Sequence, residues 1–277
     1  FTFSFQQVGT GCGLIGKNAA VEVDGSAYWM SENGFFRYTG KLESLPCLVE
    51  DYVYDDLNTV PRNHINAGLN NLFGEVTWFY ASSGASSIDR AVTYNYMDST
   101  ADRPVWTTSS LDRTAWEDSA VFGKPHATYY DPDSTSDSTV GNTDGTTTYY
   151  EHETGVNQVK AGTTSAIAAN IESGDFDIGQ SGIPQQGDGE FMMKIRRVIP
   201  DFLQQTGTAI VTLNLRDFPS QSSSGSSLGP FDVTTSTTKI DTRARARAIA
   251  LKISNTAQGA HWKLGTFKLD IQPDGRR

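Results

Sequence analysis

Short runs of β-branched and aromatic residues, separated by turns rich in Gly, Asn, Asp and Ser, recur along the whole chain. This alternation is typical of β-strands joined by tight connections. The clearest example is YWMSENGFFRYTG, in which residues 28–30 and 35–38 flank a turn around Asn33-Gly34. Asn and Gly tolerate positive φ, so this turn closes a predicted β-hairpin. The pattern predicts an all-β protein.

Four further pairs of strand-like segments follow this hairpin. Together the pairs begin at intervals of about 45 to 50 residues, except where a polar insertion lengthens the third, and this spacing is typical of four-stranded β-propeller blades. A stacked sandwich stays open as an alternative, because the similarity between the units is faint. The expected partners are 75–80 with 91–96, 121–130 with 146–153, 192–199 with 209–215, and 243–253 with 262–271.

The pattern also divides the chain. We predict propeller-like blades of antiparallel strands in residues 1–175, and a C-terminal antiparallel β region in residues 176–277 that packs on or completes the same β domain. A Ser, Thr, Asp and Gly-rich insertion at 131–145 has nothing to bury and is expected to be mobile. Residues 55–73 form the one stretch in which we expect a short helix.

The segment DTRARARAIALKISN has an unusual alternation. On a single strand, side chains repeat every second residue, so its odd-numbered residues would share one face while alanines line the other. Such a strand passes from one environment into another along its length. The residues of the odd-numbered face are Arg243, Arg245, Arg247, Ile249, Leu251 and Ile253.

Composition excludes several classes of protein. The chain has 277 residues and a net charge of −10, which argues against binding nucleic acid through a basic face. No apolar run approaches the roughly 20 residues that a membrane-spanning helix needs. Cys12 and Cys47 lack Cys-x-x-Cys spacing, so we expect two reduced thiols. The chain begins at Phe1 within a strand-like pattern, and we therefore expect it to be the C-terminal part of a longer chain or a processed product.

GTGCGLIG matches the G-x-G-x-x-G pattern of nucleotide-binding loops at Gly11, Gly13 and Gly16. Such a loop must open a helix whose N-terminal amides face the phosphates, whereas KNAAVEVDG, which follows, has the pattern of a strand. We therefore predict an ordinary glycine-rich loop.

Other catalytic or metal-binding patterns are incomplete. SSLDRTAW, residues 109–116, approximates the Asp box of sialidases but lacks its glycine and has Trp116 out of register, so a hairpin corner with a packed Trp116 is favoured. The histidines lack metal-ligand spacing, and the Asp-rich stretches lack the EF-hand pattern. We expect no enzyme, no cofactor and no metal site.

Several stretches taken together carry a family resemblance. In order they are YWMSENGFFRYTG, LFGEVTWFYASSGASSIDRAVTYNY, RTAW, YYEHETG and WKLGTFKLDIQPDGRR. This set resembles the tail nozzle or hub proteins of short-tailed bacteriophages, also described as tail tubular protein B or packaged-DNA-stabilisation proteins. The resemblance runs from about residue 21 to residue 277, although each stretch alone is only a hairpin with aromatic residues.

The resemblance implies a structural virion protein with a β-propeller, assembled in the host cytoplasm as a homohexameric ring in the tail. The ring would surround the DNA exit channel, contact the tail adaptor and other tail proteins, and let genomic DNA pass without sequence-specific binding. Six copies of a −10 chain would carry on the order of −60 charges, which would repel phosphate. Members of the family are usually longer than this chain, which agrees with the expectation of a missing N-terminal part.

Within such a ring, Arg243, Arg245 and Arg247 are predicted interface residues that reach a neighbouring acidic subunit or adaptor. The alternative is a strand that leaves the core with exposed arginines of little energetic weight. Two other functions stay open. One is a tail-associated glycan-binding module whose exposed aromatic residues stack on sugars, with Trp78, Tyr80 and Trp106 as examples. The other, a secreted propeller hydrolase, is disfavoured by the incomplete Asp box.

Overall fold

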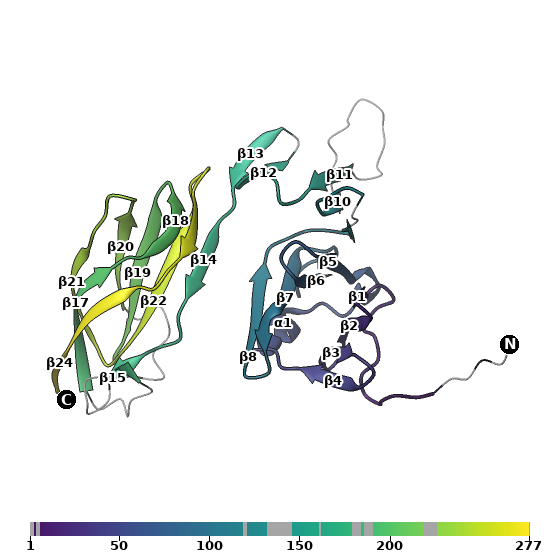
Figure 1. The fold of residues 1–277 in the computed structure, drawn as a ribbon, viewed down its shortest axis with the longest axis horizontal. Helices are drawn as coiled ribbons and strands as arrows, with labels where there is room; N and C mark the ends of the chain where they lie inside the picture. The colour runs from purple at the N-terminus through teal and green to yellow at the C-terminus, as the bar shows by residue number, and fades with distance from the viewer. Residues whose placement is uncertain are drawn as a thin grey trace. The chain divides into compact units, whose positions relative to one another are not determined.

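The structure is a computed structural model that describes residues 3, 6–118, 121–131, 146–160, 162–178, 184–185, 191–218 and 226–276. Most of these residues lie in antiparallel β-sheets (Figure 1), so the all-β prediction is confirmed. The described residues form no closed propeller. The chain divides into two compact units, residues 1–154 (unit 1) and 155–277 (unit 2), whereas the hydrophobic pattern predicts a division after residue 175.

Unit 1 contains two four-stranded meanders and a third, three-stranded sheet, in which neighbouring strands are also neighbours along the chain. The helix α1 (Glu50–Asp56) and a short 3₁₀ turn (Arg62–His64) lie between the meanders in the chain. The first meander is β1 (Ala20–Val23), β2 (Ser26–Ser31), β3 (Gly34–Tyr38) and β4 (Leu42–Leu45). The second is β5 (Asn66–Asn70), β6 (Glu75–Tyr80), β7 (Arg90–Thr100) and β8 (Arg103–Ser109), and the third sheet is β9 (Ala115–Glu117), β10 (His126–Asp131) and β11 (Thr146–Glu151).

The first three predicted strand pairs are confirmed, because β2 pairs with β3, β6 with β7 and β10 with β11. The predicted helix at 55–73 is wrong. The helix α1 ends at Asp56, and most of that stretch forms the 3₁₀ turn and the strand β5, where Asn, Gly and Asn alternate with apolar residues. The insertion predicted to be mobile lies outside the described residues except for Asp131.

The core of unit 1 lies between the two meanders. Alternate residues of β2, β3, β6 and β7 point into one shared apolar cluster. Trp78 lies at its centre with no exposed surface, and its ring packs 4.9 Å from Phe35 and 6.1 Å from Trp106 between centroids. Its Nε1–H donates to the carbonyl of Ala19 at 3.0 Å, so the one polar atom of the ring is satisfied.

The opposite face of the second meander is covered by Trp116 of β9. A Cβ on Gly68 of β5 would lie 2.5 Å from Cγ and 2.6 Å from Cδ1 of Trp116, so only glycine lets the indole approach. The Trp116 Nε1–H also donates to the carbonyl of Leu69 at 2.7 Å. The predicted packing of Trp116 is therefore confirmed, and it joins the third sheet to the second.

Gly68→Ala should therefore lower the free energy of unfolding of unit 1 by about 2 kcal/mol, because the indole must shift to admit a methyl group. Urea titration followed by tryptophan fluorescence measures this change, because unit 1 holds four of the five tryptophans. Gly84→Ala is the control, since nothing lies within 4 Å of the position that its methyl group would take. Equal midpoints for the two variants would contradict the packing described.

Unit 2 is a β-sandwich, in which two antiparallel sheets pack on one apolar cluster. One sheet has the order β14 (Ala169–Glu172), β22 (Ala248–Asn255), β19 (Ala209–Arg216) and β20 (Ser226–Val233). The other has the order β21 (Ile240–Ala246), β17 (Phe191–Ile199) and β24 (Lys268–Arg276). Three two-stranded ladders complete the unit: β12 (Asn157–Lys160) with β13 (Thr163–Ala166), β15 (Asp177–Ile178) with β16 (Pro184–Gln185), and β18 (Phe202–Thr206) with β23 (His261–Leu264).

The fourth and fifth predicted strand pairs are wrong. The strand β17 pairs with β21 and β24, whereas β19 pairs with β20 and β22. The predictions joined neighbours along the chain, but in a sandwich the chain repeatedly crosses from one sheet to the other. The pairing of β17 with β21 and β24, and of β19 with β22, therefore follows the shared core rather than proximity along the chain.

Candidate functional site

The predicted interface arginines begin on the outer side of the β21–β17–β24 sheet. Along β21, Ala244 and Ala246 are buried in the sandwich core while Arg243 and Arg245 are exposed. Arg245 donates from Nε to the carboxylate of Asp274 and from Nη2 to its carbonyl at 3.2 Å. The guanidinium of Arg243 has no hydrogen-bond or ion-pair partner among the residues that the structure describes. It is therefore free to bind another molecule.

Arg247 does not share this face. The strand β21 ends at Ala246 and β22 begins at Ala248 in the opposite sheet, with the Arg247 amide donating to the carbonyl of Arg216 at 3.2 Å. The prediction of one continuous strand with a single face is wrong. The chain here crosses between facing sheets and turns its other side to the sandwich core, so the core-facing positions change from even-numbered residues on β21 to odd-numbered residues on β22. Ile249 and Ile253 are accordingly buried, as expected for the aliphatic half.

Further cations that the sequence analysis missed join Arg243 and Arg245. Lys194 of β17 lies directly opposite Arg245, an arrangement of like charges that costs stability in the free protein. Arg197 and Lys239 both bind Asp241, at 3.1 Å and 2.8 Å. We call the whole set the cationic face: Lys194, Arg196, Arg197, Lys239, Arg243, Arg245 and Lys268. The run KIRR, residues 194–197, was a sequence signal for these cations. Its position beside Arg243 and Arg245 could be predicted only if the β17–β21 pairing were known.

Charge is distributed unevenly between the two units. Residues 1–154 contain 21 Asp and Glu against 8 Lys and Arg, a net charge of −13. Residues 155–277 contain 11 against 14, a net charge of +3. The cationic face has three acidic residues beside its seven cations, namely Asp241, Asp270 and Asp274. An acidic protein thus carries a locally basic surface, which is typical of a site for an acidic partner.

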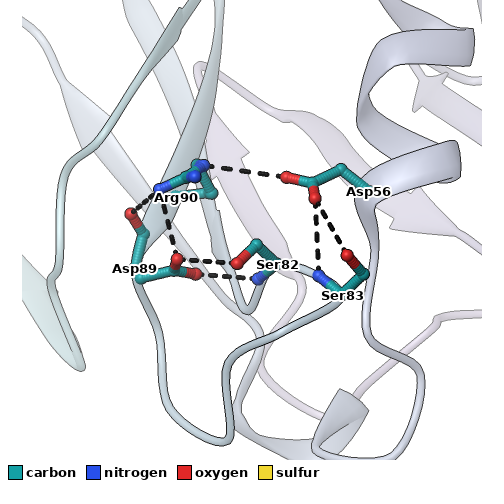
Figure 2. Close-up of polar contacts among 5 residues, drawn as sticks. All are labelled: Asp56, Ser82, Ser83, Asp89 and Arg90. Carbon is teal, nitrogen blue, oxygen red and sulfur yellow. Dashed lines mark hydrogen bonds and ion pairs between the residues drawn. The ribbon is translucent and has the colours of Figure 1, made fainter.

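Unit 1 contains a polar network in which acidic groups are compensated (Figure 2). Arg90, at the start of β7, lies between two carboxylates, with Nη1 3.1 Å from Asp89 and Nε 3.7 Å from Asp56. Asp89 also accepts from the amide and hydroxyl of Ser82, both at 2.7 Å, and Asp56 accepts from the hydroxyl of Ser83 at 3.3 Å. The network ties the end of α1 to the connection between β6 and β7, so we assign it a structural role.

A second charged cluster is buried at the edge of the third sheet. Only 3% of Arg113 is exposed, and its guanidinium binds Asp112 at 2.7 Å and lies 3.8 Å from the centroid of the Tyr150 ring. Its Nε–H donates to Nε2 of His152 at 2.9 Å, and the imidazole packs 4.4 Å from the Trp116 ring. Burial, then the charge of Arg113, lowers the pKa of His152 to about 4. The neutral imidazole is therefore part of the folded structure.

This arrangement makes unit 1 sensitive to acid. The unfolded chain binds a proton at His152 below about pH 6.5, whereas the folded chain resists protonation until about pH 4. The contribution of neutral His152 to the free energy of unfolding is therefore fully present above pH 6.5. It is lost as the pH falls toward 4, and for this partly exposed group the loss is about 2 kcal/mol. Urea titrations at pH 7 and 4.5 should show a smaller loss for His152→Gln than for the unchanged protein. His64→Gln, at an exposed position, is the control; a loss that His152→Gln leaves unchanged would contradict the assignment.

Of the aromatic residues considered for glycan binding, two are completely buried and the third is only partly exposed. Trp78 and Tyr80 have no exposed area, and Trp106 packs against the core of unit 1 while its Nε1–H donates to the carbonyl of Pro46 at 2.8 Å. Burial, then the charge of Asp56, raises the pKa of Tyr80 to about 12. These three rings therefore form no sugar-stacking platform.

The remaining motifs have no binding geometry. The glycine-rich stretch at Gly11, Gly13 and Gly16 leads into β1 rather than a helix, as predicted. The described residues contain no group of three or more His, Cys, Asp or Glu side chains placed to hold a metal ion. In the same part of the chain, no helix has the length and apolar character needed to cross a membrane. Cys12 and Cys47 are free thiols, and burial raises the pKa of Cys47 to about 11.

Neither the protein-family models nor the curated protein sequences compared with this chain match it.

Proposed function

We propose that the chain is a non-catalytic structural subunit of a short-tailed phage tail, assembled as a ring around the DNA exit channel. The sheets of unit 1 would be blades of a β-propeller, and the cationic face of unit 2 would contact a neighbouring subunit. The proposal rests on the residues that resemble the nozzle family and on the blade-like organisation of unit 1.

That organisation is the observation that carries the proposal. The three sheets of unit 1 start at Ala20, Asn66 and Ala115, at intervals of 46 and 49 residues. Their first strands are neighbours. Asn18, just before β1, forms a parallel backbone bridge with Asn66 of β5. The side-chain Nδ2–H of Asn66 donates to the carbonyl of Arg113, just before β9, at 3.2 Å. Innermost strands that run side by side around an axis are typical of propellers. Three sheets do not close a ring, so further blades would be needed.

The charges support a conduit rather than a nucleic-acid binder. Unit 1 carries a net charge of −13, and a channel lined by several copies would repel the phosphate backbone. The cations are instead concentrated in unit 2, where their alternation with buried alanines gives one outward surface. DNA would slide through such a ring, while the cations would be used in protein contacts.

Imaging of intact virions or tails that contain this chain tests the proposal. We expect a six-fold ring around an axial channel at the tail. A free monomer, or a trimeric fibre at the periphery of the particle, would contradict it.

A further inference from the structure

One end of the β5–β6 hairpin gathers acidic groups that form no ion pair with a cation among the described residues. Glu75 begins β6, Asp98 lies near the end of β7, and Glu153 follows β11. Burial, then the charges of Glu153 and Asp98, raises the pKa of Glu75. In Figure 2, by contrast, Arg90 lies between the two carboxylates of its network. The cluster around Glu75 has no described counterpart of Arg90.

A buried amide points into this cluster with one atom unused. Asn70 is 4% exposed, and its Nδ2–H donates to Oε1 of Glu153 at 2.9 Å. Its Oδ1 is buried and has no hydrogen-bond partner among the described residues. An unsatisfied buried acceptor costs free energy, so this oxygen is a place for an incoming donor. Glu153 also has a φ of 56°, a strained conformation for a residue other than glycine and one that is concentrated at functional positions.

Apolar side chains border the same end of the sheet. Leu72 and Phe73, in the β5–β6 turn, are 61% and 49% exposed, and Met97 of β7 is 69% exposed. The Met97 side chain lies over Gly74, and the Asn95 side chain donates to the carbonyl of Phe73 at 3.2 Å, so the turn is held in place. We call this surface the acidic tip: Asn70, Leu72, Phe73, Glu75, Met97, Asp98 and Glu153.

The acidic tip offers oxygen acceptors and apolar contacts, and the ligand that fits is a donor-only cation on an apolar stem. A guanidinium has five N–H donors in a planar fork and matches two carboxylates and an amide oxygen better than an ammonium does. A metal ion is a poorer match, because no described group of three acidic, His or Cys side chains is placed to hold one. The guanidinium of Arg243 is exposed and has no partner among the described residues, so it is a matching donor.

We propose that the acidic tip of one copy binds the cationic face of a second copy, with Arg243 directed at the Glu153 carboxylate and the side-chain Oδ1 of Asn70. The net charges of −13 and +3 in the two units make this head-to-tail contact attractive and oppose contacts between like units. A contact between two different surfaces continues from copy to copy and closes into a ring when the rotation allows. This contact would join neighbouring subunits of the ring proposed above, so it rests on that proposed function.

A mixing experiment with two charge-reversed chains tests the contact. Arg243→Glu and Glu153→Arg should each weaken association of the full chain at least about tenfold at low salt, as measured by mass photometry and sedimentation velocity. Mixing the two variants restores opposite charges at every junction, so we expect assembly to return only in the mixture. Assembly of the unchanged chain should weaken as salt is raised to about 1 M.

Lys17→Glu and Asp51→Arg are matched controls, because they make the same charge changes at exposed positions outside both surfaces. They should assemble like the unchanged chain. Circular dichroism of every variant verifies that loss of assembly is not loss of fold. If the chain assembles but neither reversal weakens it, or the mixture stays apart, the contact is wrong and the ring stands. If the unchanged chain is monomeric at every salt concentration, both proposals fail.

Discussion

Trp78→Ala should lower the free energy of unfolding of unit 1 by about 4 kcal/mol, the largest effect expected of any single substitution described in this chain. The indole is completely buried between the two meanders and contacts the rings of Phe35 and Trp106. Its removal leaves a cavity that the four strands of the second meander, held by their own ladders, cannot collapse to fill. It also leaves the Ala19 carbonyl without its donor.

Trp78→Phe separates the two contributions. Phenylalanine keeps most of the apolar volume but cannot donate to Ala19, so we expect a loss of about 1 to 2 kcal/mol. Val60→Ala, at a position that is 89% exposed, should change stability by less than about 0.5 kcal/mol. Urea titration followed by fluorescence and circular dichroism gives the three values. A Trp78→Ala variant within about 1 kcal/mol of the unchanged protein would mean that the meanders do not share a core.

Arg113→Met should lower the free energy of unfolding by about 3 kcal/mol, because it removes a buried cation that several buried or partly buried groups contact at once. Methionine fills much of the space of the arginine stem, so the loss is mainly electrostatic. Nε2 of His152 would lose its donor and Asp112 its guanidinium, while the Tyr150 ring would lose a cation 3.8 Å from its centroid. Loss of these contacts should also weaken the packing of the third sheet against the second.

The matched control for this variant is Arg62→Met. Arg62 forms an ion pair of the same length, 2.7 Å, with Glu32, but both side chains are more than half exposed. Its loss should cost less than about 1 kcal/mol. Urea titrations of the two variants side by side therefore measure the effect of burial on otherwise similar pairs. Similar losses for both would contradict a structural role for the Arg113 cluster.

The sequence was most informative where pairing is local. The hairpin at Asn33-Gly34 and the pairs β6–β7 and β10–β11 were predictable because each joins strands that are close along the chain. The exposure of Arg243 and Arg245 followed from their alternation with alanine. The same alternation led to the wrong prediction of one continuous strand through Arg247, because a periodicity of two does not show where a chain leaves one sheet for another.

Side-chain convergence between distant segments could not be predicted. Arg113 and His152 are 39 residues apart, and Asn70 and Glu153 are 83 apart, so nothing local in the sequence indicates that they meet. Gly68 had the appearance of a helix breaker, whereas its role is to admit the indole of Trp116. Such contacts depend on how sheets are stacked, which a hydrophobic pattern alone leaves undefined.

The crossing at Arg247 has a mechanical consequence. Because β21 and β22 are one stretch of backbone divided between the two sheets of the sandwich, neither sheet can peel away without pulling on the other. Tension applied to unit 2 would load both ladders together, and the sandwich would yield in a single event rather than layer by layer. Unit 2 would therefore hold its shape up to the load at which it failed as a whole.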